Sequence, residues 1–247
     1  MTKIDLTQHP PYIYPEYRSS RLRGPNKRPL NINDMCVEEQ RTQLSEMRGS
    51  LANRFSVSKI DNNLLLNSTQ NGIPLGERIV VSGQVLDQWG HPQPGALVEI
   101  WQANSTGRYR HKADTQDAPL DQNFSGVGRC ITDSDGKYRF YTIKPGAYPW
   151  KNHPNAWRPS HIHFSIIGET LADRLVTQMY FSGDTLLEHD PIFSATPAAN
   201  RHRLISNFDL SIAEADFALG YNFDIVLAGA KGDPVDSKEA EQPNEGP

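Results

Sequence analysis

Four side chains that could bind one metal ion lie in the middle of this sequence: Tyr109, Tyr148, His161 and His163. The two histidines stand two positions apart in an apolar, strand-prone run, Ser160 to Ile167. Because residues i and i+2 of a β-strand project from the same face, both imidazoles can reach one point. The spacing therefore predicts a pair of nitrogen ligands on one strand.

Two neutral imidazoles and two phenolates would form a site with two nitrogen and two oxygen ligands. The ordinary pKa of a phenol is about 10, so only a strong Lewis acid holds it ionised at neutral pH. Phenolate is also a hard, anionic donor. This combination favours iron(III) over zinc or iron(II).

Each of these residues also has an ordinary structural interpretation. A His-x-His pair is often two polar residues on a half-buried strand, and a single tyrosine is usually a core or interface aromatic with a hydrogen-bonded hydroxyl. Burial of the two histidines would favour the metal-ligand interpretation, because a buried imidazole costs free energy unless its nitrogens find partners. Apolar neighbours predict that both faces of this strand are buried: Ile162, Phe164, Ile166 and Ile167.

The backbone around Tyr148 is restricted by Pro145, Gly146 and Pro149, and Arg158 lies between this segment and the histidines. Loops on a rigid β-sandwich commonly carry functional side chains. On a regular strand Arg158 would not share a face with His161, although Pro159 delays strand entry and could leave the arginine at the rim of the site. A surface arginine is the alternative interpretation.

Composition excludes several classes of function. The 247 residues carry a net charge of −4, with a sequence pI of about 6.1 and a mean hydropathy of −0.60. The sequence has no basic stripe that would indicate nucleic-acid binding, and no apolar run is long enough to span a bilayer. Because the first residues lack an apolar segment, we expect no secretory signal. Two cysteines, Cys36 and Cys130, are too few for a disulfide framework, which favours a reducing cytoplasm.

Three regions follow one another along the chain. Residues 1–75 are predicted to be a partner-contacting N-terminal arm, proline-rich at its start, with a short helix over Val37 to Leu51. Residues 76–230 are predicted to form the catalytic β-domain. Residues 231–247 have the composition of a disordered tail.

Short β-prone runs separated by turn signals fill the central region, and only one short segment, Ala198 to Ile205, has a helical pattern. The pattern predicts an all-β fold, an antiparallel β-sandwich core with an extended N-terminal arm and few short helices. The expected strands are Arg78–Leu86, Leu97–Ala103, Lys137–Ile143, Ser160–Ile167, Leu175–Phe181 and Tyr221–Leu227.

Roughly residues 64 to 229 resemble the intradiol ring-cleaving dioxygenases, in particular the iron-bearing chains that act on protocatechuate (3,4-dihydroxybenzoate). The likeness is carried, in order, by segments that include Gly72-Ile73-Pro74-Leu75-Gly76-Glu77-Arg78, Leu97-Val98-Glu99-Ile100-Trp101-Gln102-Ala103-Asn104, Gly107-Arg108-Tyr109-Arg110-His111-Lys112, Phe124-Ser125-Gly126-Val127-Gly128-Arg129-Cys130, Tyr148-Pro149-Trp150, Trp157-Arg158-Pro159 and the strand of His161 and His163.

The resemblance implies a role for each matching residue. Tyr109, Tyr148, His161 and His163 match the ligands of one non-haem Fe(III) per chain, and Tyr148 also matches the ligand that leaves the metal and accepts a proton. The resemblance places five further residues at the substrate: Arg158 as a catalytic residue that stabilises negative charge on the ring, Gln178 lining the pocket, Trp150 and Ile192 in its wall, and Tyr17 near the substrate carboxylate.

The activity implied is cleavage of the protocatechuate ring by O2 between its two hydroxyl-bearing carbons, to 3-carboxy-cis,cis-muconate in the β-ketoadipate pathway. The implied partner is an iron-free α chain of related fold, with αβ protomers that assemble further. The sequence departs from the family at residues 21–60, at Leu186–Thr196, and at Asn222 and Ala228. These departures concern the ring substituent and the partner contact.

Two other functions compete with this one. A cupin-like iron(II) or zinc site could use the same His-x-His pair, but it needs a Glu three or four residues later, and the first Glu after His163 is Glu169. A non-enzymatic β-sandwich module would account for the strand and turn pattern from Ser82 to Ala96. Such a module has no need for both tyrosines and both histidines.

Overall fold

The computed structural model describes residues 57–69, 72–112, 114–150, 156–168 and 174–227. Most of the predicted N-terminal arm, including Tyr17, Cys36 and the predicted helix Val37 to Leu51, lies outside the described residues, as does the predicted tail. The proposed boundaries of the three regions stay predictions.

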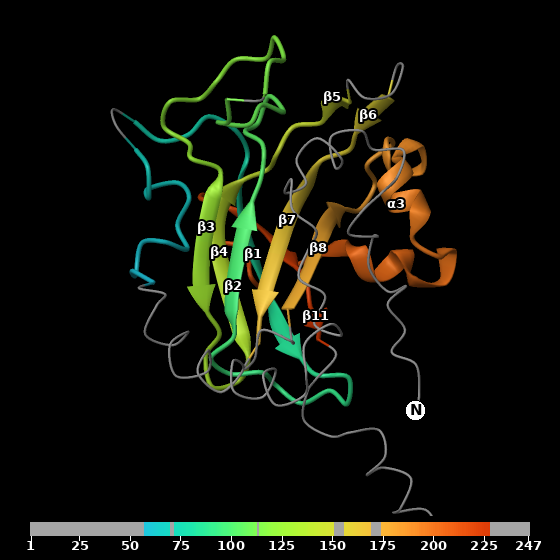
Figure 1. Cartoon of the computed structure of the whole chain (residues 1–247). Helices are drawn as coiled ribbons and strands as arrows, with labels where there is room; N and C mark the ends of the chain where they lie inside the picture. The colour runs from blue at the N-terminus through green and yellow to red at the C-terminus, as the bar shows by residue number, and fades with distance from the viewer. Residues whose placement is uncertain (1–56, 70–71, 113, 151–155, 169–173, 228–247) are drawn as a thin grey trace, which may run out of the picture.

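Strands make up most of the regular secondary structure among the described residues (Figure 1), which confirms the all-β prediction. They are β1 (Arg78–Leu86), β2 (Leu97–Trp101), β3 (Val127–Ile131), β4 (Lys137–Ile143), β5 (Tyr148–Trp150), β6 (Ala156–Arg158), β7 (His161–Ile167), β8 (Arg174–Phe181), β9 (Ile205–Phe208), β10 (Leu219–Asn222) and β11 (Ile225–Val226). The helical segments are short: η4 (Leu187–His189), α3 (Pro191–Ala195) and η5 (Ala198–Leu204).

The strands form one large, curved sheet and a separate hairpin. The large sheet has the order β11-β1-β10-β9-β8-β7-β2-β3, with β4 paired to β1, and β5 pairs with β6 alone. Most pairs are antiparallel as predicted, but β1 runs parallel to β10 and β11, and β8 runs parallel to β9. The β8–β9 pair is parallel because η4, α3 and η5 form a crossover between the two strands.

Sequence patterns located the long strands better than the short ones. The predictions over Arg78–Leu86 and Lys137–Ile143 match β1 and β4 residue for residue, and the helical segment at Ala198 is confirmed as η5. The predicted single strand Tyr221–Leu227 is instead β10 and β11. The predictions also missed β3, β5, β6 and β9, which have three to five residues each and too few positions to show a clear alternation.

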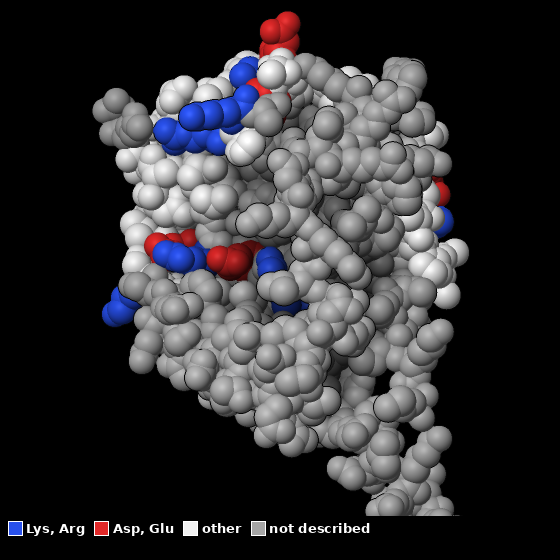
Figure 2. Space-filling view, viewed as in Figure 1, with Lys and Arg blue, Asp and Glu red and all other residues white. Residues whose placement is uncertain are grey.

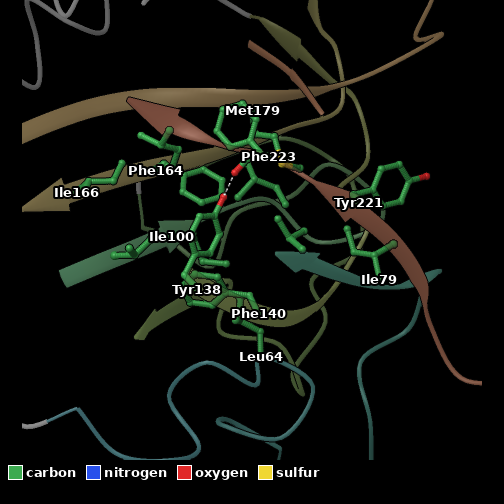
Figure 3. Close-up of a cluster of buried hydrophobic side chains, with 14 of the residues drawn as sticks. Leu64, Ile79, Ile100, Tyr138, Phe140, Phe164, Ile166, Met179, Tyr221 and Phe223 are labelled. Atoms are coloured by element: carbon green, nitrogen blue, oxygen red, sulfur yellow. Dashed lines mark hydrogen bonds between the residues drawn. The ribbon is translucent and has the colours of Figure 1, made fainter. Parts of the chain in front are cut away.

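Alternate residues of the strands build the larger of two hydrophobic clusters, between the two sides of the sheet. On β7 the residues that enter it are Ile162, Phe164 and Ile166, which are fully buried. Facing them from β4, Tyr138 packs edge-on against Phe164 and donates a hydrogen bond to the Phe223 carbonyl oxygen (Figure 3). The buried hydroxyl therefore has the polar partner that its burial requires.

Residues just before β1 belong to the same core. Leu64 and Leu65 are 0% and 2% exposed, and the Leu64 amide donates to the Tyr141 carbonyl oxygen at 2.8 Å. Figure 3 shows Leu64 beside Phe140 at one end of the cluster. The segment was assigned from sequence to the N-terminal arm, yet Leu64 and Leu65 are buried with the strands.

The described surface carries charges of both signs. In the face shown in Figure 2, one group of Lys and Arg side chains lies near the top and a row of mixed acidic and basic side chains lies below it. Among the described residues, no helix is long and apolar enough to cross a membrane.

Substitution of Phe164 by Ala is expected to lower the free energy of unfolding by about 3–5 kcal/mol, because it removes a buried ring and leaves a cavity. The control is Phe208→Ala. Because Phe208 is 49% exposed, this substitution should lower the free energy of unfolding much less. Urea unfolding at one fixed protein concentration measures both. Equal losses in the two variants would contradict the assignment of Phe164 to the core.

Candidate metal centre

The alternation of β7 places its histidines on the face opposite the core. Since Ile162 and Phe164 point into the core, His161 and His163 point the other way. The two imidazole centroids are 4.8 Å apart. This confirms that the His-x-His pair lies on one face of a strand that is buried on both sides.

Neighbouring strands add polar and aromatic residues to the same face. In the antiparallel register, His161 lies opposite Tyr180 and His163 lies opposite Gln178 of β8. On the other side, His163 lies opposite Trp101 of β2, and their rings stack at 4.8 Å with an interplanar angle of 2°. The stack fixes the plane of the His163 imidazole.

The loop after β2 carries Tyr109. Within this loop Asn104 Oδ1 accepts hydrogen bonds from the Thr106 and Arg108 amides, at 3.0 and 2.9 Å. Asp114 Oδ2 accepts from the Tyr109 amide itself at 2.8 Å. These side-chain acceptors replace strand pairing in the loop, so the position of Tyr109 is defined although it lies outside any strand.

Tyr148 begins β5, which pairs with β6 and lies above the end of the sheet where β7 begins (Figure 1). Two glycines let its segment touch the Tyr109 loop. A Cβ on Gly107 would lie 2.2 Å from the Ala147 carbonyl oxygen, and one on Gly146 would lie 2.4 Å from that of Ser105. Gly107 also has a φ of +79°, which L side chains rarely adopt. Only glycine fits at these two contacts.

The four predicted ligand residues form a closed ring of aromatic contacts. Tyr109 lies 5.5 Å from Tyr148 between ring centroids, Tyr148 lies 5.5 Å from His161, and His163 lies 6.4 Å from Tyr109. The 4.8 Å between the two imidazoles closes the ring. Residues from a loop, a short hairpin and a long strand therefore face one another.

The imidazole of His161 is oriented as a ligand would be. Its Nδ1 lies 2.7 Å from the Pro159 carbonyl oxygen, which can only accept, so Nδ1 carries the proton. The lone pair is therefore on Nε2, which lies 3.4 Å from the Tyr148 hydroxyl. Burial, with Arg158 and His163 nearby, holds the pKa of His161 well below its ordinary value, and the ring is neutral.

The donor set fits a ferric ion better than the alternatives. Among the described residues, no group of three His, Cys, Asp or Glu side chains could hold a metal ion. Among these residues, a cupin-like site would therefore lack the Glu that it needs in addition to the two histidines. Two histidines and two phenols, with the Tyr109 hydroxyl oxygen itself buried, make the mixed nitrogen and oxygen set that iron(III) favours.

Arg158 is buried in the site, so its interpretation as a surface residue was wrong. It is 1% exposed and pairs with Asp190, with Nε–Oδ1 and Nη2–Oδ2 distances of 3.1 and 3.2 Å. Burial alone would lower the pKa of Arg158, but the nearby Tyr148 and Asp190 raise it above the ordinary value. The guanidinium is a permanent cation beside the tyrosines.

The other predicted residues are placed as follows. Gln178 accepts a hydrogen bond from Arg158 Nη2, and the Arg158 Cζ lies 5.9 Å from the Trp150 ring centroid. Ile192 is buried in α3, and its amide donates to Asp190 Oδ1, which also accepts from Arg158 Nε. Tyr17 is outside the described residues.

Three residues of the site were missed from the sequence: Trp101, Tyr180 and Asp190. Tyr180 donates to Gln178 Oε1 at 3.0 Å and accepts from Arg158 Nη2 at 3.3 Å. Its pKa is raised well above the ordinary value by burial and by Asp190, so it stays a neutral phenol. Trp101 and Tyr180 could have been found from strand register, because both lie opposite a histidine of β7.

Comparison with known proteins gives two family matches. A model described as Dioxygenase matches residues 53–229, and a model described as Protocatechuate 3,4-dioxygenase beta subunit N terminal matches residues 5–33. Together they cover the sheet, the four-ring cluster and part of the predicted arm.

Individual relatives agree with these matches. The chain is 54% identical over 236 residues to a protocatechuate 3,4-dioxygenase beta chain from Burkholderia cepacia, covering 96% of this chain and 97% of the relative. It is 32% identical over 174 residues to a catechol 1,2-dioxygenase from Candida albicans, covering 64% of this chain and 54% of the relative.

Among solved structures, a 3-chlorocatechol 1,2-dioxygenase from Rhodococcus opacus matches with a TM-score of 0.53 at 25% identity, covering 69% of this chain and 66% of that one. A catechol 1,2-dioxygenase from Pseudomonas arvilla matches with a TM-score of 0.50 at 27% identity, covering 75% of this chain and 60% of that one.

Replacement of His161 by Ala is expected to remove most of the iron from protein purified with the metal. Loss of a supporting contact alone commonly costs about 10- to 100-fold in metal affinity, and loss of a ligand costs more. His91→Ala is the matched control, because the His91 side chain is 74% exposed and pairs with Asp87. Elemental analysis measures iron per chain, and full occupancy in His161→Ala would refute the ligand assignment.

Proposed function

Because this chain belongs to the intradiol ring-cleaving dioxygenase family, we propose that it cleaves the ring of protocatechuate with O2 between the two hydroxyl-bearing carbons, giving 3-carboxy-cis,cis-muconate. The observation that carries the proposal is the closed cluster of Tyr109, Tyr148, His161 and His163. The choice of substrate is supported by the 54% identity to a protocatechuate 3,4-dioxygenase beta chain over nearly the whole length.

The two phenols and two imidazoles of this cluster would hold one non-haem ferric ion per chain. When bound, the ion supplies a Lewis acid and a template for both catechol oxygens. The protein's part is to fix the donors before the substrate arrives. The Pro159 carbonyl fixes the tautomer of His161, the Trp101 ring fixes the plane of His163, and Asp114 fixes the backbone at Tyr109.

Tyr148 is the residue proposed to accept a proton from a substrate hydroxyl at its own phenolic oxygen. Two observations favour Tyr148 over Tyr109 for this role. Its hydroxyl lies 3.4 Å from His161 Nε2, and its segment is a three-residue strand in an isolated hairpin. The Tyr109 loop, by contrast, is held by several side-chain hydrogen bonds, one of them to the Tyr109 amide itself.

Arg158 is proposed to stabilise negative charge that develops on the substrate ring. A fixed cation in a buried, low-dielectric site interacts more strongly with such charge than it would in water. Two of its three guanidinium nitrogens, Nε and Nη2, are used by Asp190, Gln178 and Tyr180. The third, Nη1, has no hydrogen bond to any described residue and is the donor left for a substrate.

The chain is proposed to act as the iron-bearing β chain of an assembly of αβ protomers, with an iron-free α chain as its partner. The family match over residues 5–33 supports this, because that model describes a beta subunit N-terminus. We place the assembly in the cytoplasm. Two cysteines in the sequence are too few for a disulfide framework, which favours a reducing compartment.

The visible absorption spectrum of the iron-loaded protein, co-expressed with its α partner, tests the proposal. Phenolate ligands on ferric iron should give a broad charge-transfer band, and the band should shift when protocatechuate is added without oxygen. A colourless protein with confirmed iron would exclude phenolate ligands. Admission of O2 with protocatechuate or with catechol then shows which ring is cleaved, and cleavage of catechol alone would overturn the proposed substrate.

Tyr148→Phe is expected to retain iron but to slow both substrate binding and turnover, because the phenol that accepts the proton is lost. General-base groups typically contribute about 10²–10⁴-fold. The matched control is Tyr141→Phe, since the Tyr141 hydroxyl bonds to Glu214 rather than to the site. Stopped-flow absorbance measures binding and steady-state oxygen uptake measures turnover. Rates equal to the parent's would contradict the base role of Tyr148.

A further inference from the structure

Asp190 is a buried carboxylate that contacts Arg158 through both oxygens. It is 0% exposed, and the Arg158 side chain that it faces is also buried. Its Oδ1 accepts from Nε at 3.1 Å and its Oδ2 accepts from Nη2 at 3.2 Å. Two parallel bonds fix both the plane of a guanidinium and its distance from the carboxylate, whereas a single bond leaves the plane free to turn.

The same residue holds the start of α3. Asp190 Oδ1 also accepts from the Ile192 amide at 3.1 Å, and the Asp190 carbonyl oxygen accepts from the Ser194 amide at 2.9 Å. Pro191 follows as the first helical residue, where its missing N–H costs nothing. One side chain thus joins the guanidinium of β6 to the segment that carries Ile192 and Phe193.

The other side chains that hydrogen-bond to the guanidinium are neutral. Gln178 and Tyr180 contact Nη2, and the Phe193 ring packs edge-on against Tyr180 at 5.1 Å. Asp190 is therefore the anion that pairs with Arg158 among the described side chains that contact it. Without Asp190, the guanidinium could rotate about its terminal bonds and turn a different nitrogen outward.

We propose that Asp190 is a positioning residue for the ring-cleavage reaction, which fixes the Arg158 guanidinium so that Nη1 is left as the donor to the substrate. The proposal rests on the proposed function, because it assumes that Arg158 acts on the substrate ring. Asp190 acts through Arg158 and touches no reacting atom. Its second contact, to α3, keeps Ile192 in a constant position relative to that donor.

The variant that tests this role is Asp190→Asn in the full assembly. Asparagine keeps the shape of the side chain and is a good helix N-cap, but it has no charge, and its single acceptor oxygen cannot make two parallel bonds to one guanidinium. Asp209→Asn is the matched control: Asp209 is an aspartate that accepts from the amide two residues on, at 2.8 Å, in an exposed turn. It is expected to change neither kcat nor KM.

In Asp190→Asn, kcat per bound iron is expected to fall about tenfold or more, because small misplacements of a catalytic group cost up to about 100-fold. The dissociation constant for protocatechuate, measured without oxygen from the shift of the charge-transfer band, should change far less. In the Arg158→Gln background, the same Asp190→Asn change should alter kcat by less than about twofold, since residues that act as a unit are non-additive. An unchanged kcat, or an equal loss in both backgrounds, would overturn the proposal.

A second measurement does not depend on turnover. Urea unfolding of the iron-free parent, the two single variants and the double variant gives the coupling between Arg158 and Asp190, which should be strongly non-additive. If the losses in unfolding free energy of the two single variants add up to that of the double variant, and the parent is active, the positioning role of Asp190 is overturned and the proposed function stands. A parent that cleaved no catechol ring would overturn the proposed function, whatever the coupling between the two residues.

Discussion

The alternation of one seven-residue strand is the constraint on which the rest of the site depends. On β7, Ile162, Phe164 and Ile166 are fully buried in the core, so the residues between them must face the other way. A shift of one residue in the register would move both histidines into the core and the isoleucines into the site. Pairing with β2 on one side and β8 on the other holds the register, so the stability of the core and the geometry of the site are set by the same hydrogen bonds.

The tyrosines, in contrast, come from segments with little strand pairing, and they depend on close contact between two turns. Gly107 and Gly146 allow backbone-to-backbone approach that a Cβ would prevent, and the Gly146 amide donates to the Asn104 carbonyl oxygen at 2.9 Å. The Ser160 hydroxyl donates to the Pro145 carbonyl oxygen at 2.6 Å and so ties the start of β7 to the Tyr148 segment. The sheet supplies a rigid half of the cluster, and the loops supply a half that is precise but less strongly held.

Sequence reasoning reached the parts of the molecule that local pattern determines. The strands β1 and β4 are long, β-prone runs of nine and seven residues and were predicted to the residue, and the common face of His161 and His163 followed from their spacing. Asp190 could not be found in this way, because its partner Arg158 is 32 residues distant and the crossover between β8 and β9 brings the two together. The burial of Arg158 was also missed, since pattern alone shows neither the β5–β6 hairpin nor the carboxylate that makes burial of a cation tolerable.

That buried pair shows how the site balances stability against chemistry. Removing two charges from water is costly, and an apolar pair of similar size would often be as stable or more stable. What the ion pair adds here is a cation held in one orientation beside two tyrosines and a neutral imidazole, in surroundings where its field is little screened. The same low dielectric keeps His161 unprotonated and Tyr180 neutral, because each would otherwise carry an uncompensated charge. The charges in this part of the fold are therefore better explained by the electrostatics of the reaction than by any contribution to folding.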